Sequence, residues 1–195
     1  MYTKWMTFVL TIVLIGTATL FAKQKESTMA GQKMDKSADR SFITSAAEAN
    51  LAEIDIGKMA AQKSTDPAVK DFANRMVTDH TQASQKLASV AEMNGVKLPM
   101  EASATERNQK SELEKLSGAQ LNDAYLRDEL QGHKETISAF ESEIEHGQNQ
   151  EAKNYAEQTL PTLQDHIRIA ENVAGKLGLP GKAGLSDEAK AITAK

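Results

Sequence analysis

Helical periodicity dominates the chain between Ser41 and Leu179. Apolar residues recur there every three or four positions, few prolines intervene, and no run alternates at the two-residue period of a strand. Ala, Glu, Lys, Gln and Leu are abundant in this stretch, and all of them favour helix. The pattern predicts an all-α protein whose four long helices span about 41–63, 67–94, 119–146 and 149–177.

Several helix ends are marked by residues that suit them. Asp66 followed by Pro67 is typical of a helix start, because Asp caps the first free N–H groups and Pro fits the first helical position. Asn94-Gly95 predicts a helix end, and Gly147 closes the third long helix. Pro161 falls inside the last helix, where a missing backbone N–H predicts a kink.

The lengths of the connections predict the topology. Only a few residues join the first two long helices, and the same holds for the last two, so each pair is expected to form an antiparallel hairpin. Between the pairs lies a long connection, 95–117, in which 103–116 reads as a short, mostly solvated helix. Two hairpins joined by one long crossover are the ferritin-like four-helix arrangement, here expected over residues 41–180. An up-down-up-down bundle would need only a short middle loop.

The two ends of the chain read differently from the domain. Residues 1–22 combine an early lysine with a nearly uncharged apolar run, which is typical of a secretory signal peptide; an uncleaved anchor that associates with a membrane is the alternative. Residues 23–40 are expected to be a flexible linker and residues 181–195 a flexible tail. An exported protein without cysteine has no disulfide and depends on its core for stability.

Composition disfavours several classes of function. The net charge is −4 and its acidic and basic residues are interspersed, so no basic stripe for nucleic acid is present. No glycine-rich phosphate loop and no Ser/His/Asp spacing can be recognised in the sequence. The protein partner and the oligomeric state are left open.

Three of the four long helices carry a histidine in the middle of the apolar stripe, and the remaining one carries a glutamate at the matching position. Buried ionisable groups are costly unless they are paired or bind a metal, so a function is sought here. Counted from the two hairpin turns, the members of each pair lie at similar heights, and we expect one layer across the bundle. The candidate metal ligands are Glu53, His80, His133 and His166.

Imidazole and carboxylate ligands suit iron, copper, zinc or manganese, and no thiolate narrows the choice. Met76 and Glu129 each lie one turn before a histidine of the layer, so both are additional candidate ligands. The alternative is a purely structural polar layer, in which Glu53 pairs with a protonated histidine and fixes the helix register.

Four neighbouring residues have simpler interpretations. Asp79 and Asp165 directly precede histidines and point away around the helix, so each either orients an imidazole of another helix or is exposed. Tyr125 and Tyr155 are interpreted as core aromatics rather than redox residues.

The sequence resembles the exported ferritin-like family known as domain of unknown function 4142, described as periplasmic or outer-membrane proteins of bacteria. The resemblance covers about 41–176 and implies a four-helix ferritin-like bundle located in the periplasm or outer envelope, without implying an activity. Met-x-x-Asp-His and Leu-Pro-x-Leu-x-x-His occur in the order typical of the family. The stretches that carry it are Glu48–Glu53, Phe72–His80, Ala124–Leu126 with His133, and Thr159–His166.

The chain departs from true ferritins at their metal motif. Those di-iron proteins carry Glu-x-x-His on two helices, whereas the residues three before the histidines of the layer are Val77, Leu130 and Leu163. A ferritin-type ferroxidase is therefore disfavoured.

Three hypotheses of function follow. The leading one is a non-enzymatic envelope bundle that binds a metal ion or small ligand at the Glu/His layer. The second is a metal-dependent oxidase or peroxide-handling enzyme of ferritin-like type, which needs an open coordination position. The third is a structural or stress-protective bundle without a ligand.

Overall fold

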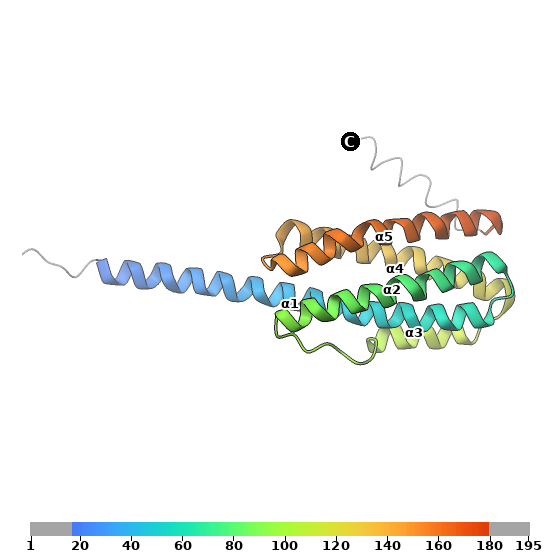
Figure 1. The fold of residues 1–195 in the computed structure, drawn as a ribbon, viewed down its shortest axis with the longest axis horizontal. Coiled ribbons are helices and arrows are strands. Elements are labelled where there is room, and N and C mark those ends of the chain that lie inside the picture. The colour runs from blue at the N-terminus through green and yellow to red at the C-terminus, as the bar shows by residue number, and fades with distance from the viewer. Residues whose placement is uncertain (1–16, 180–195) are drawn as a thin grey trace, which may run out of the picture.

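The computed structural model describes residues 17–179, and their side chains from residue 37 onward. Helices are the only regular secondary structure in this part of the chain, which contains five of them (Figure 1). They are α1 (Thr17–Lys63), α2 (Pro67–Met93), α3 (Ala104–Glu114), α4 (Gly118–His146) and α5 (Gln150–Lys176).

The N-terminal helix is longer than the sequence pattern predicts. α1 begins at Thr17 rather than near Ser41, so residues 23–40, expected to be a flexible linker, are helical. The segment is rich in Lys, Gln, Ala and Met, has a single glycine and lacks proline, so nothing in it stops a helix from propagating. Figure 1 shows these first turns of α1 extending beyond the end of the bundle.

The remaining predictions for the chain ends concern residues outside the described range. The expected signal peptide, 1–22, lies outside it apart from the first turns of α1, and the expected tail, 181–195, lies outside it entirely. Within residues 17–179, none of the helices combines the length and the apolar character that crossing a bilayer requires.

Both ends of α2 carry the capping residues that the sequence predicts, and α3 and α5 begin with side-chain caps as well. Asp66 Oδ1 accepts hydrogen bonds from the N–H groups of Ala68 and Val69, and Pro67 takes the first helical position of α2. α2 ends at Asn94, followed by Gly95 with a positive φ of 58°. α3 begins with a capping box in which Ser103 and Glu106 bond reciprocally. α5 is capped by Asn149 and runs without interruption through Pro161.

The long helices form two hairpins that pack on each other. α1 packs along α2, and α4 packs along α5, while α2 also contacts α5 and α1 contacts α4. The crossover 95–117 contains α3, which lies against α1 and α4. This arrangement is the connectivity that the loop lengths predict (Figure 1).

Gly57 brings the helices of the first hairpin close together. A Cβ atom at this position would lie 3.0 Å from Val77 Cγ2 and 3.1 Å from the carbonyl oxygen of Ala73, both on α2. Helix backbones can approach this closely only where the side chain between them is missing.

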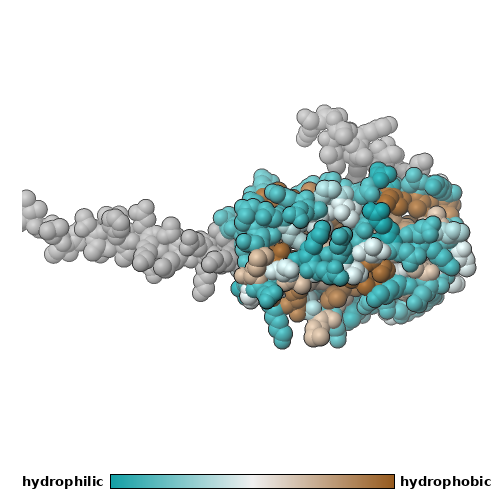
Figure 2. All heavy atoms as spheres, viewed as in Figure 1, coloured by the Kyte–Doolittle hydropathy of each residue, from teal (hydrophilic) through white to brown (hydrophobic). Residues whose placement is uncertain are grey.

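The core consists of two apolar clusters. One lies toward the α1–α2 turn and contains Ile56, Phe72, Tyr125 and Val173; the other lies toward the α4–α5 turn and contains Ile43, Leu87, Phe140, Tyr155 and Leu163. Along α2, α4 and α5 the histidines of the candidate layer lie at the boundary between the two clusters, whereas Glu53 on α1 lies between two residues of the first cluster. Figure 2 shows that the visible surface over this core is largely hydrophilic.

Candidate metal centre

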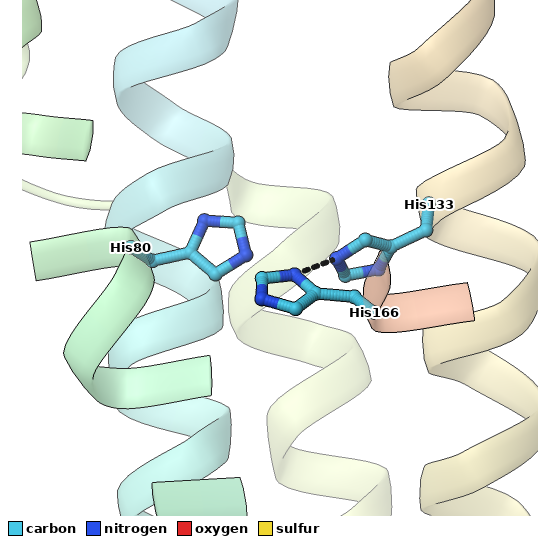
Figure 3. A group of neighbouring side chains, drawn as sticks. All are labelled: His80, His133 and His166. Atoms are coloured by element: carbon cyan, nitrogen blue, oxygen red, sulfur yellow. Dashed lines mark hydrogen bonds between the residues drawn. The ribbon is translucent and has the colours of Figure 1, made fainter. Parts of the chain in front are cut away.

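Three histidines from three different helices meet in the middle of the bundle. His80 comes from α2, His133 from α4 and His166 from α5, and all are at most 4% exposed. Their ring centroids lie 5.1–5.6 Å apart, and one nitrogen of each lies within 4.8 Å of the others. Figure 3 shows the three rings converging from their helices. The helical periodicity and the heights counted from the two hairpin turns predicted that the histidines would meet.

Each imidazole is held by an oxygen acceptor on its outward side. His80 Nδ1 lies 2.8 Å from Asn50 Oδ1, and His166 Nε2 lies 2.9 Å from Asp79 Oδ2. His133 Nδ1 lies 2.9 Å from the backbone oxygen of Glu129. An oxygen acceptor requires an N–H on the nitrogen that faces it, so these contacts place a proton on every outward nitrogen.

In a neutral ring the inward nitrogen consequently carries a lone pair and no proton. His133 Nε2 lies 3.1 Å from His166 Nδ1, and His80 Nε2 is buried without a hydrogen-bond partner. Three contacts involve these two rings: His133 with the Glu129 carbonyl, His133 with His166, and His166 with Asp79. As hydrogen bonds they would need three N–H protons, whereas two neutral imidazoles carry two. Two neutral imidazoles with their outward nitrogens protonated therefore leave two lone pairs facing each other across the contact between His133 and His166.

Burial disfavours a proton in this position. It lowers the pKa of His80 well below its usual value, and the neighbouring His133 and His166 lower it further. Burial also lowers the pKa of His133 despite the opposing charge of Glu53, and that of His166 despite its hydrogen bond to Asp79. Neutral imidazole is the form that binds a metal.

Asp79 keeps its negative charge beside His166. Burial alone would raise its pKa, but the hydrogen bonds from Arg75 and His166 outweigh burial, and the pKa of Asp79 is lowered. Asp79 was expected either to orient an imidazole of another helix or to be exposed. Its contact with His166 of α5 matches the first interpretation. Asp165 instead pairs with Arg168 near the surface.

The carboxylates of the layer form a separate group. Glu53 Oε1 lies 3.9 Å and Glu129 Oε2 lies 3.5 Å from His133 Nδ1, on the side of the ring opposite the other histidines. Glu53 therefore groups with Glu129 and His133, not with His80 and His166. Met76, the other additional candidate, is fully buried in the apolar cluster toward the α1–α2 turn.

Glu129 is buried and Glu53 is partly buried, and several oxygens of this group lack partners. Glu53 Oε2, Glu129 Oε2 and the Tyr125 hydroxyl make no hydrogen bond. Burial raises the pKa of Glu129 well above its usual value, and the charge of Glu53 raises it further. Burial likewise raises the pKa of Glu53, although the nearby His133 opposes the shift. Tyr125 and Tyr155 both lie in the core, as expected.

Two small cavities adjoin the histidines. One of about 30 Å³ is lined by His80, His166 and Thr159, with Lys86 and Gln158 at its rim. A second of about 10 Å³ lies between Glu53, Asn50, His80 and His133. The larger one has room for a water-sized ligand.

Asn50 is the site residue that the sequence analysis did not identify as such. It is 4% exposed, and besides meeting His80 its Nδ2 donates to the Tyr155 hydroxyl over 3.1 Å. Asn50 lies three residues before Glu53 and therefore on the same face of α1. That spacing was the available signal, but an amide on an apolar stripe does not by itself indicate a metal.

Comparisons with known proteins give a family and a fold. The model of the family DUF4142, a domain of unknown function, matches residues 24–173. No curated protein matches the chain.

Two crystal structures of DUF305 proteins resemble the fold, each at 15% identity. A DUF305 fragment from Deinococcus radiodurans has a TM-score of 0.63, covering 71% of this chain and 96% of its own. A candidate secreted DUF305 protein from Streptomyces coelicolor has a TM-score of 0.61, covering 73% and 94% respectively.

Proposed function

The chain belongs to DUF4142, a family of unknown function, so its activity has to be inferred from the site, and we propose that it is an exported, non-enzymatic bundle that binds a transition-metal ion through His80, His133 and His166. The ion takes His80 Nε2, His133 Nε2 and His166 Nδ1. These are the three nitrogens that the outward hydrogen bonds leave unprotonated.

The hydrogen-bond partners of the outward nitrogens carry this proposal. Metal-binding histidines in proteins almost always donate their second N–H to a carboxylate, a carbonyl or a water, which fixes the tautomer. Here Asp79, the Glu129 carbonyl and the Asn50 amide oxygen supply one such acceptor for each ring. A purely structural layer has no need to leave three nitrogen lone pairs facing one another.

The donor set narrows the choice among iron, copper, zinc and manganese. Three imidazole nitrogens suit copper, zinc or iron better than manganese, which prefers oxygen. Copper and zinc also lie at the strong end of the general affinity order for divalent ions. The bound ion supplies a positive charge to the neutral histidine cluster.

The location and the detailed fold belong to the same proposal. The apolar segment at the start of the sequence supports export to the periplasm or outer envelope, with membrane association if that segment is retained. One structural relative is named as a candidate secreted protein. Two hairpins and a helical crossover support the ferritin-like arrangement.

Metal content tests the proposal directly. The full chain is exported by its own signal, purified without a His tag or chelators, and analysed by plasma mass spectrometry. About one equivalent of metal is expected in the wild type, with loss in His80→Ala/His166→Ala. The matched control is His146→Ala, because His146 is exposed at the end of α4. If copper, zinc and iron all fail to bind, the histidines are a structural polar layer.

The larger cavity favours a second candidate function. His80 and His166 both line it, and a water-sized ligand there would reach an ion held by the histidines. A metal-dependent oxidase or peroxide-handling enzyme requires such an open position. Oxygen or peroxide consumption that depends on bound metal, and that His80→Ala/His166→Ala abolishes, would establish this activity. If the metal-loaded protein consumes neither, only the binding function stands.

A further inference from the structure

Glu53 and Glu129 lie on the opposite side of His133 from the other two histidines. Glu53 projects from α1 and Glu129 from α4, and their side chains are 19% and 4% exposed. Each carries a buried Oε2 atom that accepts no hydrogen bond. Two ionised carboxylates in this position are costly unless a proton neutralises one of them or a cation lies between them.

The Tyr125 hydroxyl faces the same group. Tyr125 is fully buried one turn before Glu129 on α4, and its oxygen lies beside the Glu129 carboxylate without a hydrogen bond in normal geometry. A buried phenol usually finds a partner for its O–H. Three oxygens from two helices therefore converge, and none of them is paired with a group outside this cluster.

Neighbouring side chains do not supply the missing charge. In the part of the chain whose side chains are described, no lysine or arginine forms an ion pair with either glutamate, and the basic nitrogen that contacts both is His133 Nδ1. That nitrogen already donates to the backbone oxygen of Glu129. Glu106 of α3 adds further negative charge near Glu53.

We propose that Glu53, Glu129 and the Tyr125 hydroxyl form a second cation site, which takes a divalent ion that prefers oxygen ligands. A divalent ion neutralises two carboxylates, and manganese, calcium and magnesium all favour such ligands. His133 separates this oxygen site from the nitrogen site of the three histidines. The two sites thus select different ions, and neither depends on the other being filled.

Manganese tests the oxygen site by electron paramagnetic resonance, because the six-line signal of free Mn²⁺ disappears when the ion binds. The full-length wild type is first given one equivalent of Zn²⁺, which prefers the three imidazoles. About one equivalent of Mn²⁺ per chain is then expected to bind. Glu53→Gln/Glu129→Gln should weaken Mn²⁺ binding by at least about tenfold, and excess Ca²⁺ should compete.

Matched variants separate this site from the histidine site. Glu135→Gln/Glu141→Gln removes two exposed carboxylates of α4 and should bind Mn²⁺ like the wild type. His80→Ala/His166→Ala should lose zinc while keeping manganese, so failure of the histidine site leaves the oxygen site measurable. Circular dichroism checks folding, and if the double glutamate variant does not fold, Glu129→Gln and Tyr125→Phe replace it.

Two results would overturn the proposal. One is that Mn²⁺ does not bind to the zinc-loaded wild type. The other is that Mn²⁺ binding is unchanged in Glu53→Gln/Glu129→Gln, or in both of the single variants Glu129→Gln and Tyr125→Phe. The two glutamates would then be a buried pair that shares a proton, without a role in ion binding.

Discussion

The imidazole of His166 on α5 and the carboxylate of Asp79 on α2 meet at 2.9 Å, joining the two hairpins of the bundle. Arg75, one turn before Asp79 on α2, holds the same carboxylate. The ionised Asp79 keeps the proton of His166 on Nε2, so Nδ1 faces the other histidines as a lone pair.

Replacing Asp79 should therefore weaken metal binding without removing a ligand. In Asp79→Asn we expect about a 10–100-fold loss of affinity for Zn²⁺ or Cu²⁺, measured by competition with a coloured chelator. Asp165→Asn is the matched control, since Asp165 pairs with Arg168 near the surface. Equal affinities in the two variants would show that His166 does not depend on Asp79.

Asn50 should matter for stability even in the absence of metal. Asn50→Ala removes the acceptor of His80 and the donor to Tyr155, both buried. Leaving buried polar groups unpaired costs on the order of 1–3 kcal/mol each, so the free energy of unfolding in urea with chelator should fall by about that amount. Asn154→Ala, on the exposed face of α5, should change it by less than about 0.5 kcal/mol. A similar small loss in both variants would contradict the role of Asn50.

Metal removal should lower the stability of the wild type. An ion that binds only the folded chain adds about 2.7 kcal/mol when its free concentration is a hundred times its Kd. For a domain of this size that corresponds to a rise in Tm of roughly 5–10 °C, seen by calorimetry with and without Zn²⁺. His80→Ala/His166→Ala should show no zinc-dependent rise beyond what the neighbouring oxygen site contributes, whereas His146→Ala should behave like the wild type. An unchanged wild-type Tm at saturating zinc would contradict the site.

Glu143 should make stability fall as the pH rises toward neutrality. Burial and the nearby Asp39 carboxylate raise its pKa from 4.5 to about 7. Because the folded state holds the proton more tightly, this stabilisation is complete below about pH 4.5 and is lost as the pH rises through about 7. The loss is on the order of 1–3 kcal/mol.

Glu143→Gln should remove this part of the pH dependence, which urea unfolding between pH 4 and 8 would measure. Glu141→Gln, an exposed neighbour on the same helix, should keep it. The interpretation is wrong if the wild type and Glu143→Gln lose stability in parallel over this range.

Much of the fold follows from local sequence signals. Asp66-Pro67 and Asn94-Gly95 mark the ends of α2 within a residue or two, because caps and glycine act through the adjacent backbone. The start of α1 was wrong by more than twenty residues. A segment of good helix formers without an apolar stripe can be either a helix or a flexible linker. The composition of 23–40 therefore did not distinguish the two.

The site could be predicted only in part. The helical period indicates which face a residue occupies, so His80, His133 and His166 were expected to meet. The period does not fix the side-chain rotamer or the rotation of a helix about its axis. It therefore could not show that Glu53 lies beyond His133 with Glu129, or that Asn50 reaches His80.

Gly57 sets a limit on how the centre of the bundle can change. Its missing side chain allows the α1 backbone to rest against Ala73 and Val77, one turn from Glu53 and two from Asn50. Adding a single methyl group here would press on Val77 and on the Ala73 carbonyl, so α1 and α2 would have to move apart by a few tenths of an ångström beside Asn50 and His80. The clearance between two helices, and not the ligands alone, thus constrains how α1 presents Asn50 to the histidine on α2.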